Sequence, residues 1–122
     1  MAKVLTDEPD YAAIINSLYD KTRKGKIAWE KSGEPMRYRA TVGDSLSFVV
    51  FLYITNPDEQ ESAHILRMHG PDDEPIFAIS TTTPELEEAQ YDKISEIYRL
   101  AGRIADDVDD QITRALKVLK KA

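Results

Sequence analysis

Cysteine is absent from the 122-residue chain, and histidine occurs only twice. The first absence excludes disulfides, thiol nucleophiles, iron–sulfur clusters and cysteine zinc sites. Long hydrophobic runs are also missing, because the longest, from Phe48 to Ile54, has seven residues. Such a run suits a buried strand, whereas a membrane helix needs about 20 apolar residues. The N-terminal residues lack the apolar core of a secretory signal. We therefore expect a cytoplasmic protein that makes no contact with a membrane.

Recognisable catalytic and ligand-binding motifs are missing as well. The chain contains no Gly-x-Gly-x-x-Gly, P-loop or Gly-x-Ser-x-Gly pattern. His64 and His69 are an odd number of positions apart in one predicted strand, so they should point to opposite faces and not share a metal. The acids of residues 106–110 lack the spacing of a calcium loop and are typical of a solvated helix face or a helix cap. We predict no catalytic residue, no metal and no cofactor, and keep a small enzyme with an unmarked site as an alternative.

The residues that are present predict one α+β domain spanning residues 1–122. Hydrophobic residues make up 42% and charged residues 31%, an ordinary balance for a globular protein. Residues 8–24 carry one apolar stripe, formed by Tyr11, Ile14, Ile15 and Leu18 at helical spacing. We expect Thr6 or Asp7 to cap this helix and Gly25 to end it in a left-handed conformation.

Five short strands should follow, separated by turns that contain glycine or proline, at residues 26–31, 36–42, 45–55, 63–69 and 75–80. Short connections favour an antiparallel meander. Residues 84–121 then repeat apolar side chains at helical spacing, with Thr82 or Thr83 as the cap. An unbroken helix of this length would measure about 57 Å, against about 30 Å for a small domain. It should therefore break near Gly102 or at Asp106–Asp110, or project onto another copy of the chain.

The central predicted strand is apolar on both of its faces. One face carries Leu46, Phe48, Val50, Leu52 and Ile54, and the other carries Val49, Phe51 and Tyr53. Exposing either set to water would cost several kcal/mol, of the order of the stability of a small domain. Two arrangements satisfy this requirement. Either one helix covers each face, or a second copy or another protein covers one of them.

The turn at Gly43-Asp44 decides how these faces align with the preceding strand. A two-residue type II′ loop would pair Val42 with Ser45. That register places Tyr38, Val49 and Phe51 in the main core, with Arg37 and Arg39 at the rim of the Phe48 face. A three-residue loop would shift the pairing by one and place both arginines in water. We predict the two-residue loop, because it uses glycine where a positive φ is required.

Charge is distributed unevenly along the chain. The net charge is −6, yet residues 21–39 hold seven cations against two acids. An acidic protein disfavours nonspecific nucleic-acid binding, although a local basic segment can hold phosphate. The candidates for a phosphate or single-stranded nucleic-acid site are Lys24, Lys26, Lys31, Arg37 and Arg39. Trp29 alternates with Ile27, and we interpret it as a core residue, not as a base-stacking residue.

Two stretches carry a resemblance to a known group of proteins. They are Thr22-Arg23-Lys24-Gly25-Lys26-Ile27-Ala28-Trp29-Glu30, at a helix-to-strand junction, and Ile97-Tyr98-Arg99-Leu100-Ala101-Gly102-Arg103 in the last helix. The chain resembles small uncharacterised bacterial and prophage-type α+β proteins that share a helix, a Thr-x-x-Gly-Lys-x-x-Trp junction, an antiparallel meander and a terminal helix. The resemblance implies this fold and a bacterial origin. It implies no catalytic residue.

The function that the sequence favours is a protein–protein interaction module, not an enzyme. We expect a homodimer or a complex with another protein, formed through an apolar sheet face and the terminal helix. The predicted interface residues are Leu46, Phe48, Val50, Leu52, Arg37 and Arg39. Binding of single-stranded nucleic acid or a phosphate ligand by the basic segment is the alternative.

Overall fold

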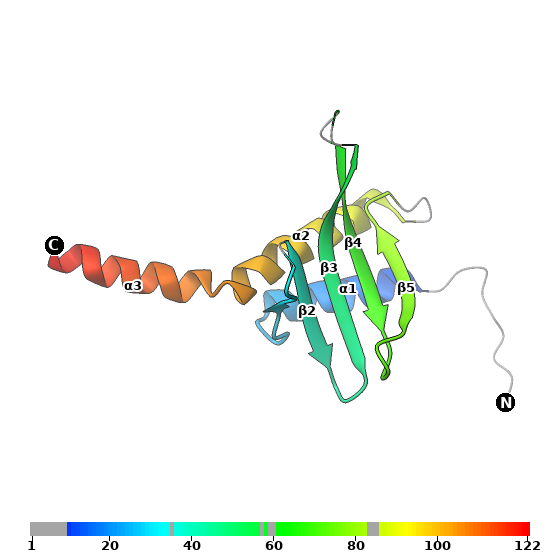
Figure 1. The fold of residues 1–122 in the computed structure, drawn as a ribbon, viewed down its shortest axis with the longest axis horizontal. Coiled ribbons are helices and arrows are strands. Elements are labelled where there is room, and N and C mark those ends of the chain that lie inside the picture. The colour runs from blue at the N-terminus through cyan, green and yellow to red at the C-terminus, as the bar shows by residue number, and fades with distance from the viewer. Residues whose placement is uncertain (1–9, 35, 57, 59–60, 83–85) are drawn as a thin grey trace, which may run out of the picture.

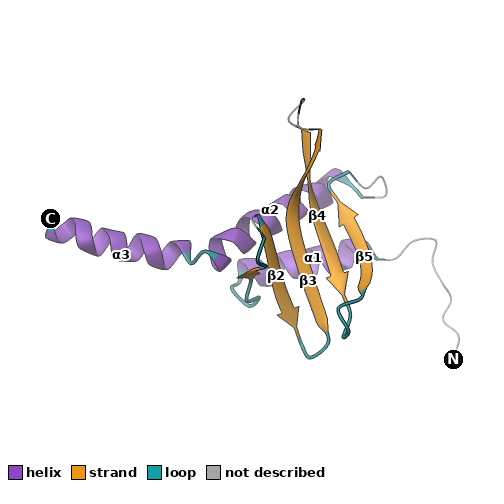
Figure 2. Cartoon of the chain, in the orientation of Figure 1, coloured by secondary structure: helices purple, strands orange, loops and turns teal. Residues whose placement is uncertain are grey.

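A helix, a five-stranded antiparallel sheet and two C-terminal helices make up the fold (Figures 1 and 2). The structure, a computed structural model, describes residues 10–34, 36–56, 58, 61–82 and 86–122. The helices are α1 (Tyr11–Arg23), α2 (Glu88–Ala105) and α3 (Val108–Lys121). The strands are β1 (Glu30–Lys31), β2 (Arg37–Val42), β3 (Leu46–Asn56), β4 (Glu61–His69) and β5 (Pro75–Ser80), which pair in sequence order. The predicted α+β class and meander are confirmed.

Helix α1 begins and ends with side-chain and backbone caps. The Asp10 side chain accepts a hydrogen bond from the Ala13 amide at 3.0 Å, whereas the predicted caps Thr6 and Asp7 lie outside the described residues. At the other end Gly25 has a φ of +71°, as predicted. The Gly25 amide donates to the Thr22 carbonyl and the Lys26 amide to the Lys21 carbonyl, at 3.1 and 2.9 Å. This pair of bonds is a Schellman motif, which requires the left-handed residue that glycine supplies at low cost.

The segment after Gly25 returns to the end of α1 before it enters the sheet. Trp29 is 3% exposed, and its indole Nε1 donates a hydrogen bond to the buried Thr22 hydroxyl at 3.2 Å. Trp29 and Ile27 both belong to the core, as the sequence predicts for Trp29. Because these residues pack inward instead of pairing with β2, strand β1 covers only Glu30–Lys31 and not the predicted residues 26–31.

The predicted register of β2 against β3 is wrong by one residue. Val42 pairs with Leu46, and three residues, 43–45, form the turn. Gly43 still takes a positive φ of 66°, but in the longer loop. As a result, Arg39 lies opposite Val49 and Arg37 opposite Phe51. Since neighbours across a sheet share a face, both arginines lie on the Val49 and Phe51 face.

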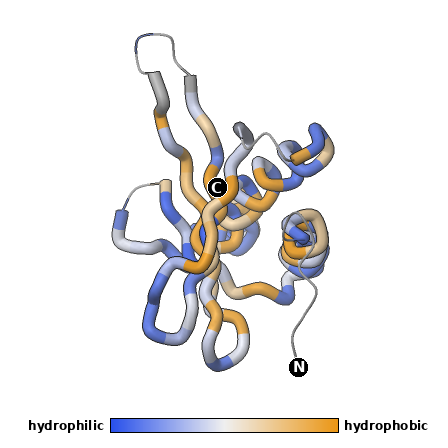
Figure 3. Tube along the Cα trace, turned by 90° about the vertical axis from the view of Figure 1, so that its right-hand side faces the viewer, coloured by the Kyte–Doolittle hydropathy of each residue, from blue (hydrophilic) through white to orange (hydrophobic). Residues whose placement is uncertain are grey.

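Both helices that cover the sheet lie on the same face of it. Figure 3 shows the sheet and the helices as two layers seen along their edges, and in Figure 1 the strands lie in front of α1 and α2. The core between the layers joins sheet residues with helix residues, namely Ala40, Phe48, Val50, Leu66 and Ile79 with Ile15, Leu18, Ile94, Ile97 and Ala101. The predictions that Val49 and Phe51 form the main core, and that one helix covers each face, are therefore wrong.

The C-terminal helical segment breaks where the acidic residues begin, within one of the two predicted regions. Helix α2 begins at Glu88 with Glu87 as its N-cap residue, so the predicted start at residue 84 and the predicted cap Thr82 are wrong. Thr83 and Pro84 lie outside the described residues. Asp106 follows its last turn, and Asp107 adopts a left-handed φ of 54°, which an aspartate tolerates better than most residues. Helix α3 then extends away from the two layers (Figure 1).

Candidate functional site

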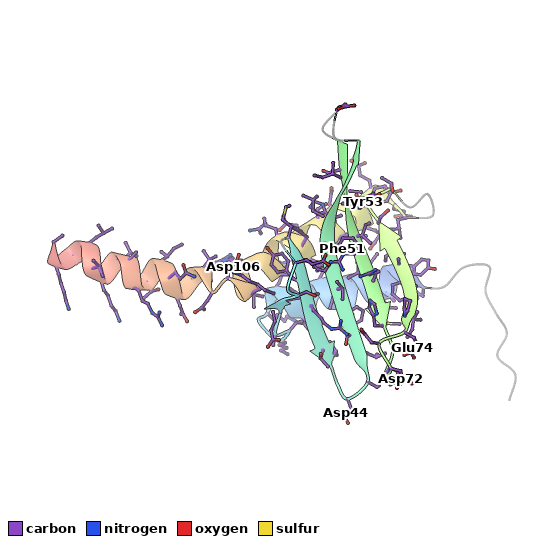
Figure 4. All side chains as sticks on the ribbon, in the orientation of Figure 1. Asp44, Phe51, Tyr53, Asp72, Glu74 and Asp106 are labelled. Atoms are coloured by element: carbon purple, nitrogen blue, oxygen red, sulfur yellow. The ribbon has the colours of Figure 1, made fainter. Side chains whose placement is uncertain are left out.

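Three arginines and a phenylalanine gather on the sheet face opposite α1 and α2. Arg39, Val49 and Arg67 lie in one row across β2, β3 and β4, and Arg37 lies opposite Phe51 in the next row. We call Arg37, Arg39, Phe51 and Arg67 the arginine face. Figure 4 labels Phe51 and, further along the same strand, Tyr53, which is 55% exposed.

Arginine side chains cover the apolar residues of this face. The Cζ atoms of Arg37 and Arg67 lie 4.4 and 5.0 Å from the centre of the Phe51 ring, within cation–π distance. Val49 is only 2% exposed although α1 and α2 pack on the opposite face. The arginines on either side of Val49 explain its burial, because their aliphatic stems lie along apolar surface while the guanidinium groups stay in contact with water.

The three arginines differ in how their charge is balanced. Arg39 donates a hydrogen bond to the Asp73 carboxylate, and this bond lowers the pKa of that carboxyl group. Arg37 forms a looser ion pair with Glu34, at 3.5 Å. Arg67 forms no ion pair with any of the described acids, and its Nε is buried without a hydrogen-bond partner. Burial, followed by the neighbouring Arg37, lowers the pKa of Arg67. The arginine face thus contains one cation whose charge is not neutralised by contact.

Helix α3 presents a second distinctive surface. None of its residues is buried, and four of its large apolar side chains are more than half exposed: Ile112, Leu116, Val118 and Leu119. At 100° per residue, Ile112, Ala115, Leu116 and Leu119 fall on one side of the helix, which we call the α3 stripe. Acids occupy the first turn of α3 and lysines its last turn.

The predicted apolar interface lies inside the molecule. Phe48 and Val50 are 8% and 0% exposed and belong to the core beneath α1 and α2. Leu46 and Leu52 are half-buried on the same side of β3. Assigning this face to a partner was therefore wrong, because the chain's own helices pack against it. Arg37 and Arg39, predicted at its rim, lie on the opposite face.

The predicted phosphate-binding cations do not form one cluster. Lys24 pairs with Asp20 on α1, and Lys31 pairs with Asp106, each at 3.0 Å. Lys26 lies in the loop after α1, while Arg37 and Arg39 lie on the sheet. Counting charge along one segment missed Arg67, which belongs to β4. The period-2 pattern of that strand was the available signal, since it places Arg67 on one face with Ile65 and His69.

The two histidines lie on opposite sides of the sheet, as their spacing predicts. His64 Nδ1 lies 3.0 Å from the Ser95 hydroxyl of α2, and its ring meets the Tyr98 ring edge-on at 4.7 Å between centroids. Burial lowers the pKa of His64. His69 Nδ1 lies 3.1 Å from the Asp73 carbonyl, beside the arginine face. Within the described ranges, no group of three or more histidine, aspartate or glutamate side chains is placed to hold a metal ion.

An open groove of about 330 Å³ lies between the end of α1 and the α2–α3 junction. Its charged residues include Arg103 and Asp109, which bind each other through two bonds of 3.0 Å. Partial desolvation and the neighbouring Asp110 raise the pKa of Asp107 in the same groove. The groove thus contains the Arg103–Asp109 ion pair and, beside it, the Asp107 carboxyl group with its raised pKa.

None of the helices in the described parts of the chain is both long and apolar enough to cross a membrane. Comparison with protein-family models, with curated proteins and with solved structures gives no match to this chain.

Proposed function

We propose that this protein is an interaction module that pairs with a second copy of itself through α3. The observation that carries the proposal is a strongly amphipathic 14-residue helix none of whose residues is buried. Four of its large apolar side chains are more than half exposed: Ile112, Leu116, Val118 and Leu119. The rest of the fold already has a core between the sheet and α1 and α2.

The exposed state of α3 is unfavourable for two reasons. Isolated helices shorter than about 12–15 residues are only marginally stable in water. Each large apolar side chain left in water also forgoes about 1.5–3 kcal/mol that full burial would provide. Ile112, Leu116 and Leu119 therefore favour a state in which the α3 stripe packs against another apolar surface.

The charge pattern of α3 favours a second α3 in antiparallel orientation as that surface. Asp109 and Asp110 occupy the first turn, and Lys120 and Lys121 the last turn. Antiparallel pairing brings the acidic end of each helix beside the basic end of the other, whereas parallel pairing brings like charges together. The apolar residues at 108, 112, 115 and 119 are four, three and four positions apart. This spacing is typical of the residues at which two helices of a coiled coil contact each other.

The proposal is tested by the oligomeric state of two matched variants. Leu116→Glu places a carboxylate in the α3 stripe, and Thr113→Glu adds the same charge outside it. In light scattering across a concentration series, we expect dimers for the unaltered chain and for Thr113→Glu, and folded monomers for Leu116→Glu. A monomeric unaltered chain at all concentrations, or dimers that persist in Leu116→Glu, would contradict the proposal.

A bacterial origin and a cytoplasmic location are parts of the same proposal. The resemblance carried by residues 22–30 and 97–103 supports the bacterial origin. The cytoplasmic location is the expectation stated from the sequence. Thr22 and Trp29, two residues of the motif that carries the resemblance, are joined by a hydrogen bond that holds the helix-to-strand junction together. Fractionation of cells that express the full chain tests the location, and recovery with the membranes or outside the cell would contradict it.

A further inference from the structure

The arginine face combines cationic and apolar side chains on one surface of the sheet. It occupies the sheet face opposite α1 and α2, over the three central strands (Figures 1 and 4). Three guanidinium groups lie there around an apolar floor of Val49 and Phe51. Guanidinium groups stacked on a ring keep their N–H donors in their own plane, where they remain available to a flat anion.

The acids already present on this face show which anion suits it. Arg39 binds the Asp73 carboxylate, and Arg37 has the Glu34 carboxylate 3.5 Å away. Arg67 brings a third guanidinium to this face from β4, yet none of the described acids pairs with it. One further carboxylate in contact with this guanidinium would neutralise the cation.

The size of the local charge argues against a long polyanion. Three arginines face two acids on this surface, and Asp72 and Glu74 add negative charge at the adjoining turn. The whole chain carries a net charge of −6. A nucleic-acid strand binds by neutralising several successive phosphates, which this surface does not offer. A partner segment with one carboxylate among apolar side chains fits both the single free cation and the exposed Tyr53.

We propose that the arginine face binds an extended acidic segment of a partner protein, with one carboxylate held by Arg67 and the neighbouring apolar side chains resting on Phe51 and Tyr53. An extended segment fits because alternate residues of a strand point to one side, with a repeat of about 7 Å. One carboxylate and the apolar groups two residues away from it can then meet successive rows of the sheet. This surface is separate from α3, so the proposal does not depend on dimer formation.

The test measures binding of short fluorescein-labelled peptides by fluorescence anisotropy. The probe carries one central glutamate flanked on each side by alternating serine and valine, and its control has lysine in place of that glutamate. We expect the first to bind the full chain, more weakly at about 300 mM than at about 50 mM salt, and the second not to bind. Arg67→Gln should weaken binding at least about tenfold, and Arg67→Lys by less. Arg99→Gln, which removes an exposed arginine of α2, and Leu116→Glu should leave binding unchanged.

Two further measurements keep the outcome decisive. Chemical-shift changes in the amides of β2, β3 and β4 on titrating the unaltered protein locate the peptide even where Arg67→Gln loses stability. Binding of an oligothymidylate of similar length, measured in the same way, tests whether the face binds nucleic acid instead. No binding of the glutamate peptide at millimolar concentration, equal loss in Arg99→Gln, or shifts confined to helices would overturn the proposal. So would tighter, Arg67-dependent binding of the oligonucleotide, which would assign the face to nucleic acid.

Discussion

On the sheet face opposite α1 and α2, arginine side chains shield apolar residues from water. Val49 is almost completely buried, and the arginines beside it in the same row supply that cover. Arg37 and Arg67 also stack on Phe51, which keeps the ring half-buried. An apolar strand face can therefore avoid water without a second helix layer, because the stem of an arginine is itself apolar.

A single histidine should make stability depend on pH. His64 is partly buried between β4 and α2, and burial lowers its pKa below the ordinary value of 6.5. The unfolded chain therefore binds more protons than the folded chain at pH values just below 6.5. The free energy of unfolding should fall as the pH drops through about 6.5, and should level off below the folded-state pKa. Urea unfolding at intervals from about pH 7.5 to 5.5 measures this slope.

The matched variant for this prediction is His64→Gln, which can still bond to Ser95 but does not titrate. Other groups contribute equally to the pH dependence of both chains, so the difference between the two slopes isolates His64. Identical slopes for the two chains between pH 7 and 5.5 would contradict the assignment.

The helix-to-strand junction explains why a short motif can specify local structure. The positive φ of Gly25 completes the Schellman motif, and the chain then turns back so that Trp29 reaches Thr22. The four named positions of the Thr-x-x-Gly-Lys-x-x-Trp pattern are Thr22, Gly25, Lys26 and Trp29, and all four take part in the hydrogen bonds of this turn. The motif thus forms a structural connection between α1 and β1.

Removing the Thr22 hydroxyl should destabilise this junction. In Thr22→Val the side chain keeps its shape, but the Trp29 Nε1 loses its acceptor in a buried position. A buried donor without a partner costs about 1–3 kcal/mol. We expect chemical unfolding followed by tryptophan fluorescence to show a loss of that size. Thr22→Ser keeps the hydroxyl and serves as the control. A Thr22→Val chain as stable as the unaltered one would show that water or another group satisfies the indole.

Strand positions were more predictable than strand pairing. The predicted strand 75–80 has the same limits as β5. The predicted strand 36–42 begins one residue before β2, and the predicted strand 45–55 begins and ends one residue before β3. The register failed because two-residue and three-residue loops both accept Gly43 with a positive φ. That one-residue difference moved Arg37 and Arg39 to the opposite face, and it decides where the candidate site lies.

The whole molecule divides into a packed body and a projecting helix. The body has its core between the sheet and α1 and α2, while α3 contributes no buried residue to it. Among the described contacts, the ion pair between Arg103 and Asp109 and the bond from Gln111 to the Asp106 carbonyl connect α3 to α2. Such exposed contacts are worth little, so the orientation of α3 is set mainly by what it packs against.

Truncation should separate the stability of the body from self-association. A chain that ends at Asp106 retains the Lys31 ion pair and every core residue. Its free energy of unfolding should lie within about 0.5 kcal/mol of that of the monomeric Leu116→Glu chain, as is usual for changes on the surface. Light scattering should show a monomer. A loss of several kcal/mol in urea unfolding would mean that α3 belongs to the body, and dimers of the truncated chain would place the interface elsewhere.

The sequence alone determined the kinds of elements and most of their limits, because helical and strand periodicity and the residues of turns and caps act over a few neighbouring positions. It also indicated that β3 is apolar on both faces. Only the tertiary structure decided which face α1 and α2 cover, that arginines from β2 and β4 lie on the other, and that no residue of α3 is buried. These features depend on contacts between residues far apart in the chain, such as Arg67 with Phe51 and Arg39 with Asp73, and a shift of one residue in pairing reverses which side chains can meet.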